Sequence, residues 1–180
     1  MNIFKIKLKE VFYKLENKGI IIMKKISELD DILLITSFDI GQILKISTTI
    51  WKDEGLYPIS QIHSVIKDNL SYSIKIQGEI ISFCLVERKK KKNEANIFLI
   101  AVKDNYRNKG LGYRILNYCI KNAKKEGINN FFLHVSANNE IAINLYKKFG
   151  FEIIKIIDNY YHSKIYPEIN KAYLMNLIYN

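Results

Sequence analysis

The stretch that constrains the fold most is IFLIAVKDNYRNKGLG, residues Ile97–Gly112. Its first part, IFLIAV, is continuously apolar, as is typical of a strand covered on both faces. Its last part, RNKGLG, holds two glycines and leads into apolar residues at helical spacing: Leu111, Ile115, Leu116, Cys119 and Ala123. The stretch therefore predicts a buried strand over Ile97–Val102, then a loop, then a helix that opens at the glycines.

The glycine-containing loop has the composition of a phosphate-binding site. The first backbone N–H groups of a helix have no partner within it, and the helix dipole favours negative charge there. Gly110 and Gly112 let a phosphate approach the main chain, and Arg107 and Lys109 add positive charge. No Gly-Lys-Ser/Thr ending of a nucleotide P-loop is present, and the third glycine and later acidic residue of a dinucleotide fingerprint are missing. Two interpretations remain: a diphosphate-binding loop of another type, or a turn that binds no ligand.

Strands and helices alternate around this stretch. Residues 72–76 and 79–87 have strand periodicity on either side of a Gln77-Gly78 turn, which predicts a hairpin. Further strands are predicted at 131–135, 151–157 and 172–178, and helices at 30–50 with an interruption near Gly41, at 58–70, and from Asn138 or Asn139 to Phe149. The first two helices are expected to precede any strand. This order predicts a mixed sheet in an α/β sandwich.

The 180-residue chain is expected to form one domain, with residues 1–22 as an N-terminal extension and residues 23–180 as the domain itself. Its net charge of +10 attracts anionic ligands of several kinds without choosing among them. Cys84 and Cys119 lack the spacing of a zinc or redox motif and are expected to be buried in the core. Unpaired cysteines also suggest that the protein resides in a reducing compartment. No signal peptide or membrane span is recognisable, so a soluble, cytoplasmic protein is expected.

The chain resembles the GNAT acetyltransferases, whose acetyl-CoA signature is Gln/Arg-x-x-Gly-x-Gly/Ala after a strand. Here Arg107, Gly110 and Gly112 match that signature, and Asn139 and the stretch Ala142–Phe151 continue the resemblance downstream. The resemblance implies a mostly antiparallel sheet with helices on both faces, and acetyl-CoA as co-substrate with no metal. The residues that it implies for acetyl-CoA binding are Ile100, Ala101, Val102, Arg107, Asn108, Lys109, Gly110, Leu111, Gly112, Tyr113 and Asn139.

Within this superfamily the chain is most similar to the N-alpha-acetyltransferases, both the eukaryotic Met-preferring type and the ribosomal-protein-alanine type. The similarity lies in LHV, N-E-x-A-I, YKKFGFEII and NYY. It implies that His134 removes a proton and that Tyr160 and Tyr161 line the peptide site. One position departs from the pattern, because Asn96 stands where these enzymes carry a second catalytic tyrosine. Either the histidine works alone, or another tyrosine substitutes, or the substrate differs.

The chemistry of amine acetylation suits these residues. His134, with an ordinary pKa near 6.5, is matched to an α-amino group of pKa about 7.7–8.0. Backbone N–H groups at the end of strand Ile97–Val102, Val102 above all, are candidates to stabilise the thioester oxygen. The resemblance assigns Tyr146 the return of a proton to the thiolate, although it also fits a core-facing stripe. Asn139 is a candidate for holding the pantetheine arm and also an N-cap.

The leading hypothesis is transfer of acetyl from acetyl-CoA to a peptide or protein N-terminus, by direct attack in a ternary complex. Trp51 is a further substrate-binding candidate or, equally, a core aromatic. A polyamine or aminoglycoside acetyltransferase and a non-catalytic CoA-binding adaptor are the alternatives. The basic run Arg88–Lys92 fits a solvated hairpin tip better than a specific nucleic-acid site. A ribosome or an auxiliary subunit is a candidate partner, whereas a membrane is not.

Overall fold

The computed structural model describes residues 12–17, 20–25, 31–50, 58–91, 93–161 and 171–179, with side chains from residue 32 onward. The chain divides into two compact units, residues 1–31 and 32–180. In the first unit, β1 (Phe12–Asn17) and β2 (Ile20–Lys25) pair as an antiparallel hairpin. The predicted division of the chain into residues 1–22 and 23–180 stays a prediction.

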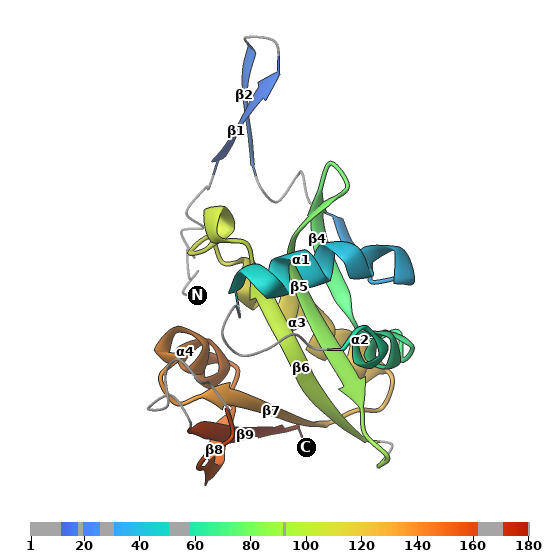
Figure 1. The fold of residues 1–180 in the computed structure, drawn as a ribbon, viewed down its shortest axis with the longest axis vertical. Coiled ribbons are helices and arrows are strands. Elements are labelled where there is room, and N and C mark those ends of the chain that lie inside the picture. Colours follow the sequence, from blue (N-terminus) through green and yellow to red (C-terminus); the bar gives the residue numbers. More distant parts are fainter. Residues whose placement is uncertain are drawn as a thin grey trace, which may run out of the picture. The chain divides into compact units, whose positions relative to one another are not determined.

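The larger unit is built on a seven-stranded sheet of order β3-β4-β5-β6-β7-β9-β8 (Figure 1). Only the pair β6–β7 is parallel, so the sheet is mixed and mostly antiparallel. The strands are β3 (Asp31–Leu34), β4 (Tyr72–Ile76), β5 (Glu79–Arg88), β6 (Glu94–Val102), β7 (Asn130–Ser136), β8 (Glu152–Ile157) and β9 (Ala172–Ile178). The helices are α1 (Ile40–Ile50), α2 (Ile59–Ile66), α3 (Leu111–Lys125) and α4 (Glu140–Lys148), with short 3-10 turns η2 (Ser37–Asp39) and η3 (Asp104–Tyr106).

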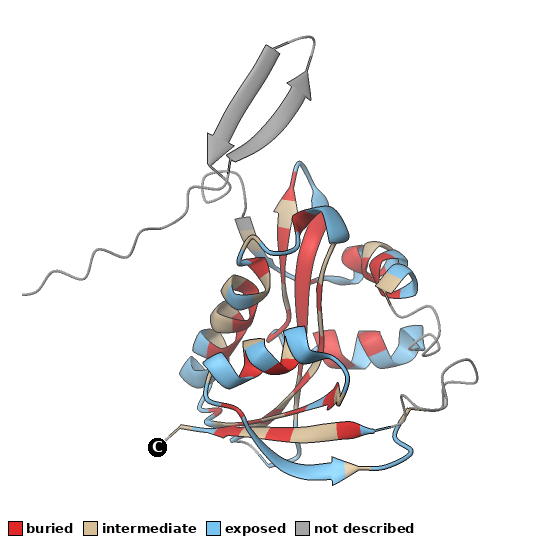
Figure 2. Ribbon diagram, turned by 90° about the vertical axis from the view of Figure 1, so that its left-hand side faces the viewer, coloured by how far each residue is buried: buried red, intermediate tan, exposed pale blue. Residues whose placement is uncertain are grey.

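Helices cover both faces of the sheet, as expected (Figure 2). The apolar sides of α1 and α2 pack on alternate residues of β5 and β6, among them Phe83, Leu85 and Leu99. The opposite face carries α3, where Cys119 lies against the backbone of Cys84 with its Sγ 3.9 Å from the carbonyl oxygen. Both cysteines are buried and free, which confirms their prediction as core residues. Among the described residues, no helix has the length and apolar character needed to cross a membrane.

The hairpin between β4 and β5 turns where the sequence predicted it. Gln77 and Gly78 have φ values of 51° and 81°, the left-handed pair that a two-residue type I′ turn requires. The side chain of Gln42 on α1 makes two hydrogen bonds to this turn. Its amide nitrogen donates to the Gly78 carbonyl oxygen at 3.1 Å, and its oxygen accepts from the Ile80 N–H at 2.8 Å. These bonds fix α1 against the hairpin.

The prediction of a helix over residues 30–40 was wrong, as was the expectation that no strand precedes the helices. Residues 31–34 form β3 at the edge of the sheet, and Ile35 continues the extended chain by donating its N–H to the Ser71 carbonyl oxygen at 2.9 Å. A capping box then starts the helical segment, since the Asp39 carboxylate accepts from the Thr36 N–H at 3.0 Å. No interruption occurs at Gly41, which lies in the first turn of α1.

The feature that positions the site is a β-bulge in β6. Leu99 pairs with Leu85 and Ile97 pairs with Val86, so Phe98 is an extra residue without a partner on β5. A bulge bends its strand and increases the local twist. On the other side of β6, pairing with β7 covers only Glu94–Asn96 opposite Asn130–Phe132 and stops just before the bulge. Beyond that point the two parallel strands part.

Candidate active site

Helix α3 begins directly after the glycine-containing loop, as the sequence predicted. Gly110 is its N-cap in the left-handed conformation, with φ 78°, and Asn108 is left-handed with φ 60°. The Arg114 N–H donates to the Gly110 carbonyl oxygen at 3.0 Å and makes the first helical bond. The N–H groups of the three residues between them, Leu111–Tyr113, therefore have no partner within the helix. We call residues Arg107–Tyr113 the α3 mouth.

The two basic side chains of the α3 mouth lie back on their own loop. Arg107 donates from Nε to the Val102 carbonyl oxygen at 3.2 Å and pairs through Nη2 with Asp104 at 2.8 Å. Lys109 donates to the Asn105 carbonyl oxygen at 2.9 Å, and its Nζ lies 5.3 Å from the centre of the Tyr106 ring. Both basic side chains thus make their contacts within the loop itself.

The open edge of β6 is continuous with this mouth. The Lys103 N–H donates to the Ile81 carbonyl oxygen at 2.9 Å, which identifies the hydrogen-bonded pairs of the β5–β6 ladder. Because such pairs alternate in an antiparallel ladder, the N–H of Ala101 faces β5, whereas those of Ile100 and Val102 face the side where β7 has parted. Ile100 and Val102 thus present main-chain donors to the opening between the strands.

Gly112 differs from Gly110 in its surroundings. A Cβ atom at Gly112 would lie 3.5 Å from Leu145 Cδ2 on α4 and 3.7 Å from Val102 Cγ2, both ordinary contact distances. The first turn of α3 is therefore packed between α4 and the end of β6. At Gly110 the space is open, and it is the positive φ that favours glycine.

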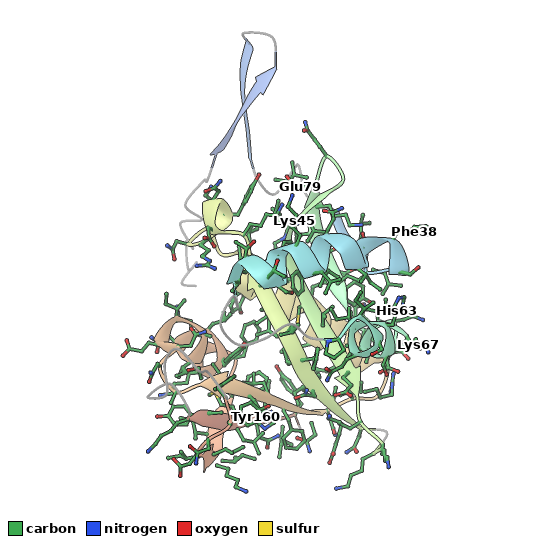
Figure 3. The ribbon with its side chains drawn as sticks, in the orientation of Figure 1. Phe38, Lys45, His63, Lys67, Glu79 and Tyr160 are labelled. Carbon is green, nitrogen blue, oxygen red and sulfur yellow. The ribbon has the colours of Figure 1, made fainter. Side chains whose placement is uncertain are left out.

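His134 lies on β7 beyond the point where the strands part. Its side chain is exposed, but its ring stacks on Tyr160 with centroids 4.7 Å apart and planes 12° apart. Loss of water on that side, and then the positive charge of Lys89, lower the pKa of His134 below its ordinary 6.5. Tyr160 in turn contacts Tyr161 edge-on at 5.0 Å, and burial raises the pKa of Tyr160. We call His134, Tyr160 and Tyr161 the His134 stack; Figure 3 shows Tyr160 beside the β7–β9 part of the sheet.

Asn96 shares a face of the sheet with His134. Asn96 pairs with Phe132 on β7, and His134 follows Phe132 by two residues, so the three side chains lie on one side of the sheet. On β5 its partner is Glu87, whose carboxylate is held by Lys89 at 2.7 Å. An amide cannot accept a proton as a base, so His134 is the titratable group of this row that suits a base at neutral pH.

Tyr146 and Asn139 both belong to α4. Tyr146 is buried, with its ring edge-on to Phe151 at 5.8 Å, and burial raises its pKa well above the ordinary 10. Its hydroxyl therefore stays protonated, as a proton donor must. Asn139 is the N-cap, because its Oδ1 accepts from the Ala142 N–H at 3.1 Å. That bond leaves the amide NH₂ of Asn139 available for another partner.

Two further features were singled out in the sequence, Trp51 and the basic run Arg88–Lys92. Trp51 is outside the described residues. In the basic run, Lys89 pairs with Glu87, Lys91 with Glu94 and Arg88 with Glu126, at N···O distances of 2.7, 3.4 and 3.9 Å. These carboxylates neutralise part of the run and agree with a solvated hairpin tip. In the described part of the chain, no group of three or more His, Cys, Asp or Glu side chains is placed to hold a metal.

The pairing of β6 with β7 ends at Asn96 and Phe132, and Ile100, Val102 and His134 all lie on these strands beyond that point. The α3 mouth and the Ile100–Val102 edge lie at one end, and the His134 stack lies across the parted strands. The bulge at Phe98, which lies just beyond the last β6–β7 pair, was missed by sequence analysis. All residues of IFLIAV are apolar, so the change of face at the bulge leaves no mark in the pattern.

Known proteins share this architecture. Danio rerio N-alpha-acetyltransferase 50 is 38% identical over 79 residues, 43% of this chain and 47% of the relative. The Escherichia coli K12 [ribosomal protein bS18]-alanine N-acetyltransferase is 34% identical over 92 residues, 51% of this chain and 61% of the relative. The matches thus span about half of these relatives' length. The structure of Arabidopsis thaliana Naa50 in complex with the bisubstrate analogue CoA-Ac-MVNAL superposes with a TM-score of 0.72 at 25% identity, covering 83% of this chain and 99% of that one.

A family-wide comparison agrees with the individual relatives. The profile of the acetyltransferase (GNAT) family matches residues 39–151, a range that contains α1, the β4–β7 strands, the α3 mouth and α4. The parted β6 and β7 strands and the open α3 mouth lie within the matched region. The chain therefore belongs to the acetyltransferase (GNAT) family.

Proposed function

We propose that the protein transfers the acetyl group of acetyl-CoA to the α-amino group of protein or peptide N-termini, by direct attack in a ternary complex. The observation that carries the proposal is the opening between β6 and β7, with main-chain donors at one end and the His134 stack at the other. Such an opening lets a donor and an acceptor approach each other from the two faces of one sheet.

The residues of the α3 mouth suit a coenzyme diphosphate. Free N–H groups at Leu111–Tyr113 and the positive end of the α3 dipole favour an anion there. The N–H groups of Ile100 and Val102 face the opening and would bond to the pantetheine arm and the thioester oxygen. The NH₂ of Asn139 is a further donor for that arm. Acetyl-CoA, when bound, supplies the acetyl group as a thioester.

The proton transfers are assigned to His134 and Tyr146. His134, kept neutral by its lowered pKa, removes a proton from the acceptor's amino group as the nitrogen attacks the carbonyl carbon. Main-chain N–H groups of β6 stabilise the negative charge that develops on the carbonyl oxygen. The C–S bond then breaks, and the Tyr146 hydroxyl gives its proton to the departing sulfur. The products are the new amide, a free thiol, a protonated His134 and a deprotonated Tyr146; His134 releases its proton to solvent and Tyr146 takes one back before the next turnover.

The acceptor is assigned from His134 and from the relatives. A neutral imidazole is matched to an α-amino group of pKa about 7.7–8.0 better than to a lysine of about 10.4. The relatives named above are N-terminal or ribosomal-protein-alanine acetyltransferases. Burial keeps Tyr160 protonated, so Tyr160 assists His134 only through the stacking of the two rings. Asn96 cannot act as a base, and we therefore assign proton removal to His134 alone.

The wider setting follows from the same proposal. Nascent or finished protein N-termini would be met in the cytoplasm, where free Cys84 and Cys119 stay reduced. A ribosome or an auxiliary subunit would bring such termini to the enzyme. Tyr161 is assigned to the acceptor side through its contact with Tyr160, and Trp51 is kept as a candidate there.

A panel of acceptors tests the proposal. The protein is incubated with acetyl-CoA and peptides of varied first residue, beside the same peptides with blocked N-termini and an internal lysine, and beside spermidine and kanamycin. Release of CoA thiol with free α-amines alone is the expected result. Acetylation of spermidine or kanamycin in preference to peptides would establish the small-amine alternative. Tight binding of acetyl-CoA without thiol release from any acceptor would establish the adaptor.

A further inference from the structure

We propose that Tyr113, stacked on Phe149, is a platform for the adenine ring of coenzyme A, and that Lys148 beside it binds the 3′-phosphate. This inference rests on the proposed use of acetyl-CoA and concerns the end of the coenzyme farthest from the reaction. It assigns a role to side chains that the phosphate cradle and the proton transfers do not use.

The aromatic pair joins the first turn of α3 to the end of α4. Tyr113 directly follows Gly112 in the α3 mouth, and Phe149 is the C-cap of α4. Their rings are stacked with centroids 4.5 Å apart and planes 27° apart. Tyr113 is nevertheless 48% exposed. Phe149 covers one face of the ring, so a base that stacks on Tyr113 would lie on the other face.

An exposed aromatic face beside a phosphate cradle has the form of a base-stacking site. Stacking of a base on an aromatic side chain contributes a measurable share of the binding free energy for any purine, because every base presents a π-face. Phe149 holds the Tyr113 ring in one orientation and so lowers the entropy lost when a base settles on it. The adenosine of the coenzyme follows its diphosphate, and Tyr113 is the side chain next to the N–H groups assigned to that diphosphate.

Helix geometry places one lysine of α4 on the same side. Leu145 lies against Gly112, with its Cδ2 3.5 Å from the Cβ position there, so this side of α4 faces the α3 mouth. Lys148 follows Leu145 by three residues and shares that side, whereas Lys147 follows by two and points away. Both lysines are exposed. The 3′-phosphate is a dianion on the ribose that carries the adenine, and Lys148 offers it a positive charge.

Truncated ligands test the platform separately from the reaction. Calorimetry is carried out with acetyl-CoA, 3′-dephospho-acetyl-CoA and S-acetyl-4′-phosphopantetheine, which lacks the adenosine. We expect Tyr113→Ala to weaken acetyl-CoA by about tenfold and to leave S-acetyl-4′-phosphopantetheine unchanged. Tyr113→Phe keeps the ring and should bind all three ligands like the natural protein. Tyr113→Ala weakening all three ligands equally, or none of them, would overturn the platform.

The lysines give a matched pair of variants. Lys148→Ala should weaken acetyl-CoA by about threefold and leave 3′-dephospho-acetyl-CoA unchanged, because only the former carries the phosphate. Lys147→Ala removes the same charge from the other side of α4 and should change neither. Equal effects of the two lysines would overturn the assignment of Lys148. If the natural protein binds neither acetyl-CoA nor S-acetyl-4′-phosphopantetheine, the proposed function itself fails. Equal affinity for these two ligands would refute the platform alone.

Discussion

The α3 mouth and the His134 stack differ in how the chain builds them. The mouth comes from one continuous segment, Arg107–Tyr113, whose conformation is set by two left-handed residues and the start of a helix. The stack joins a residue in the middle of β7 to tyrosines that follow β8. The mouth works mainly through backbone N–H groups, whereas the stack depends on the identity of one titratable side chain.

This difference indicates how strongly each end depends on the identity of its side chains. Backbone donors at a helix N-terminus are present whatever the side chains around them. On the acceptor side, Asn96 and His134 share one face of the sheet, and what they can do depends on the identity of each side chain. The two ends should therefore respond differently to substitution.

The largest expected effect is at the acceptor end. His134→Ala should lower kcat/KM for a peptide acceptor by about 10²–10³-fold, because the general base is lost. The dissociation constant for acetyl-CoA should stay the same, because His134 is not part of the α3 mouth. Steady-state kinetics and calorimetry measure the two quantities.

His63 provides the matched control for this substitution. It is an exposed histidine on α2 (Figure 3), and His63→Ala should change neither kcat/KM nor acetyl-CoA affinity. Full activity in His134→Ala would remove the base assignment. A loss of acetyl-CoA binding in that variant would show that the two ends are not independent.

A smaller effect, on the free energy of unfolding, is expected at the α3 mouth. Substitution of its two glycines should have different consequences. Gly110→Ala forces an L-residue to φ 78° and should lower the free energy of unfolding by about 1–2 kcal/mol. Gly112→Ala has an ordinary backbone conformation and only normal contacts with Leu145 and Val102, so it should lose no stability. Urea unfolding measures both variants. A loss of stability at Gly112 equal to that at Gly110 would contradict this account of the mouth.

The same difference explains how far the sequence could predict the molecule. Local signals were sufficient for the Gln77-Gly78 turn, for the α3 mouth and for Asn139 as an N-cap, because each depends on neighbouring residues. Pairing between distant strands was not predictable in this way. The strand β3 was predicted as helix because residues 31–34 form a strand only through contacts with β4 at the sheet edge. The bulge at Phe98 was hidden in a uniformly apolar strand. His134 itself was identified by resemblance, and its stacking on Tyr160 required the fold.

The smallest expected effect concerns the charge beside His134. Lys89 is the lesser of the two causes that lower the pKa of His134, after desolvation. A positive charge disfavours the imidazolium, so Lys89→Met should raise the pKa of His134 and shift its midpoint to higher pH. The midpoint should remain below 6.5, because desolvation beside Tyr160 persists.

An NMR titration of the His134 ring, assigned by comparison with His134→Ala, measures the shift. Lys89→Arg keeps the charge and the pairing with Glu87 and should leave the midpoint in place. A midpoint that does not move in Lys89→Met would assign the whole effect to the stacked ring, in which case added salt should not shift it either.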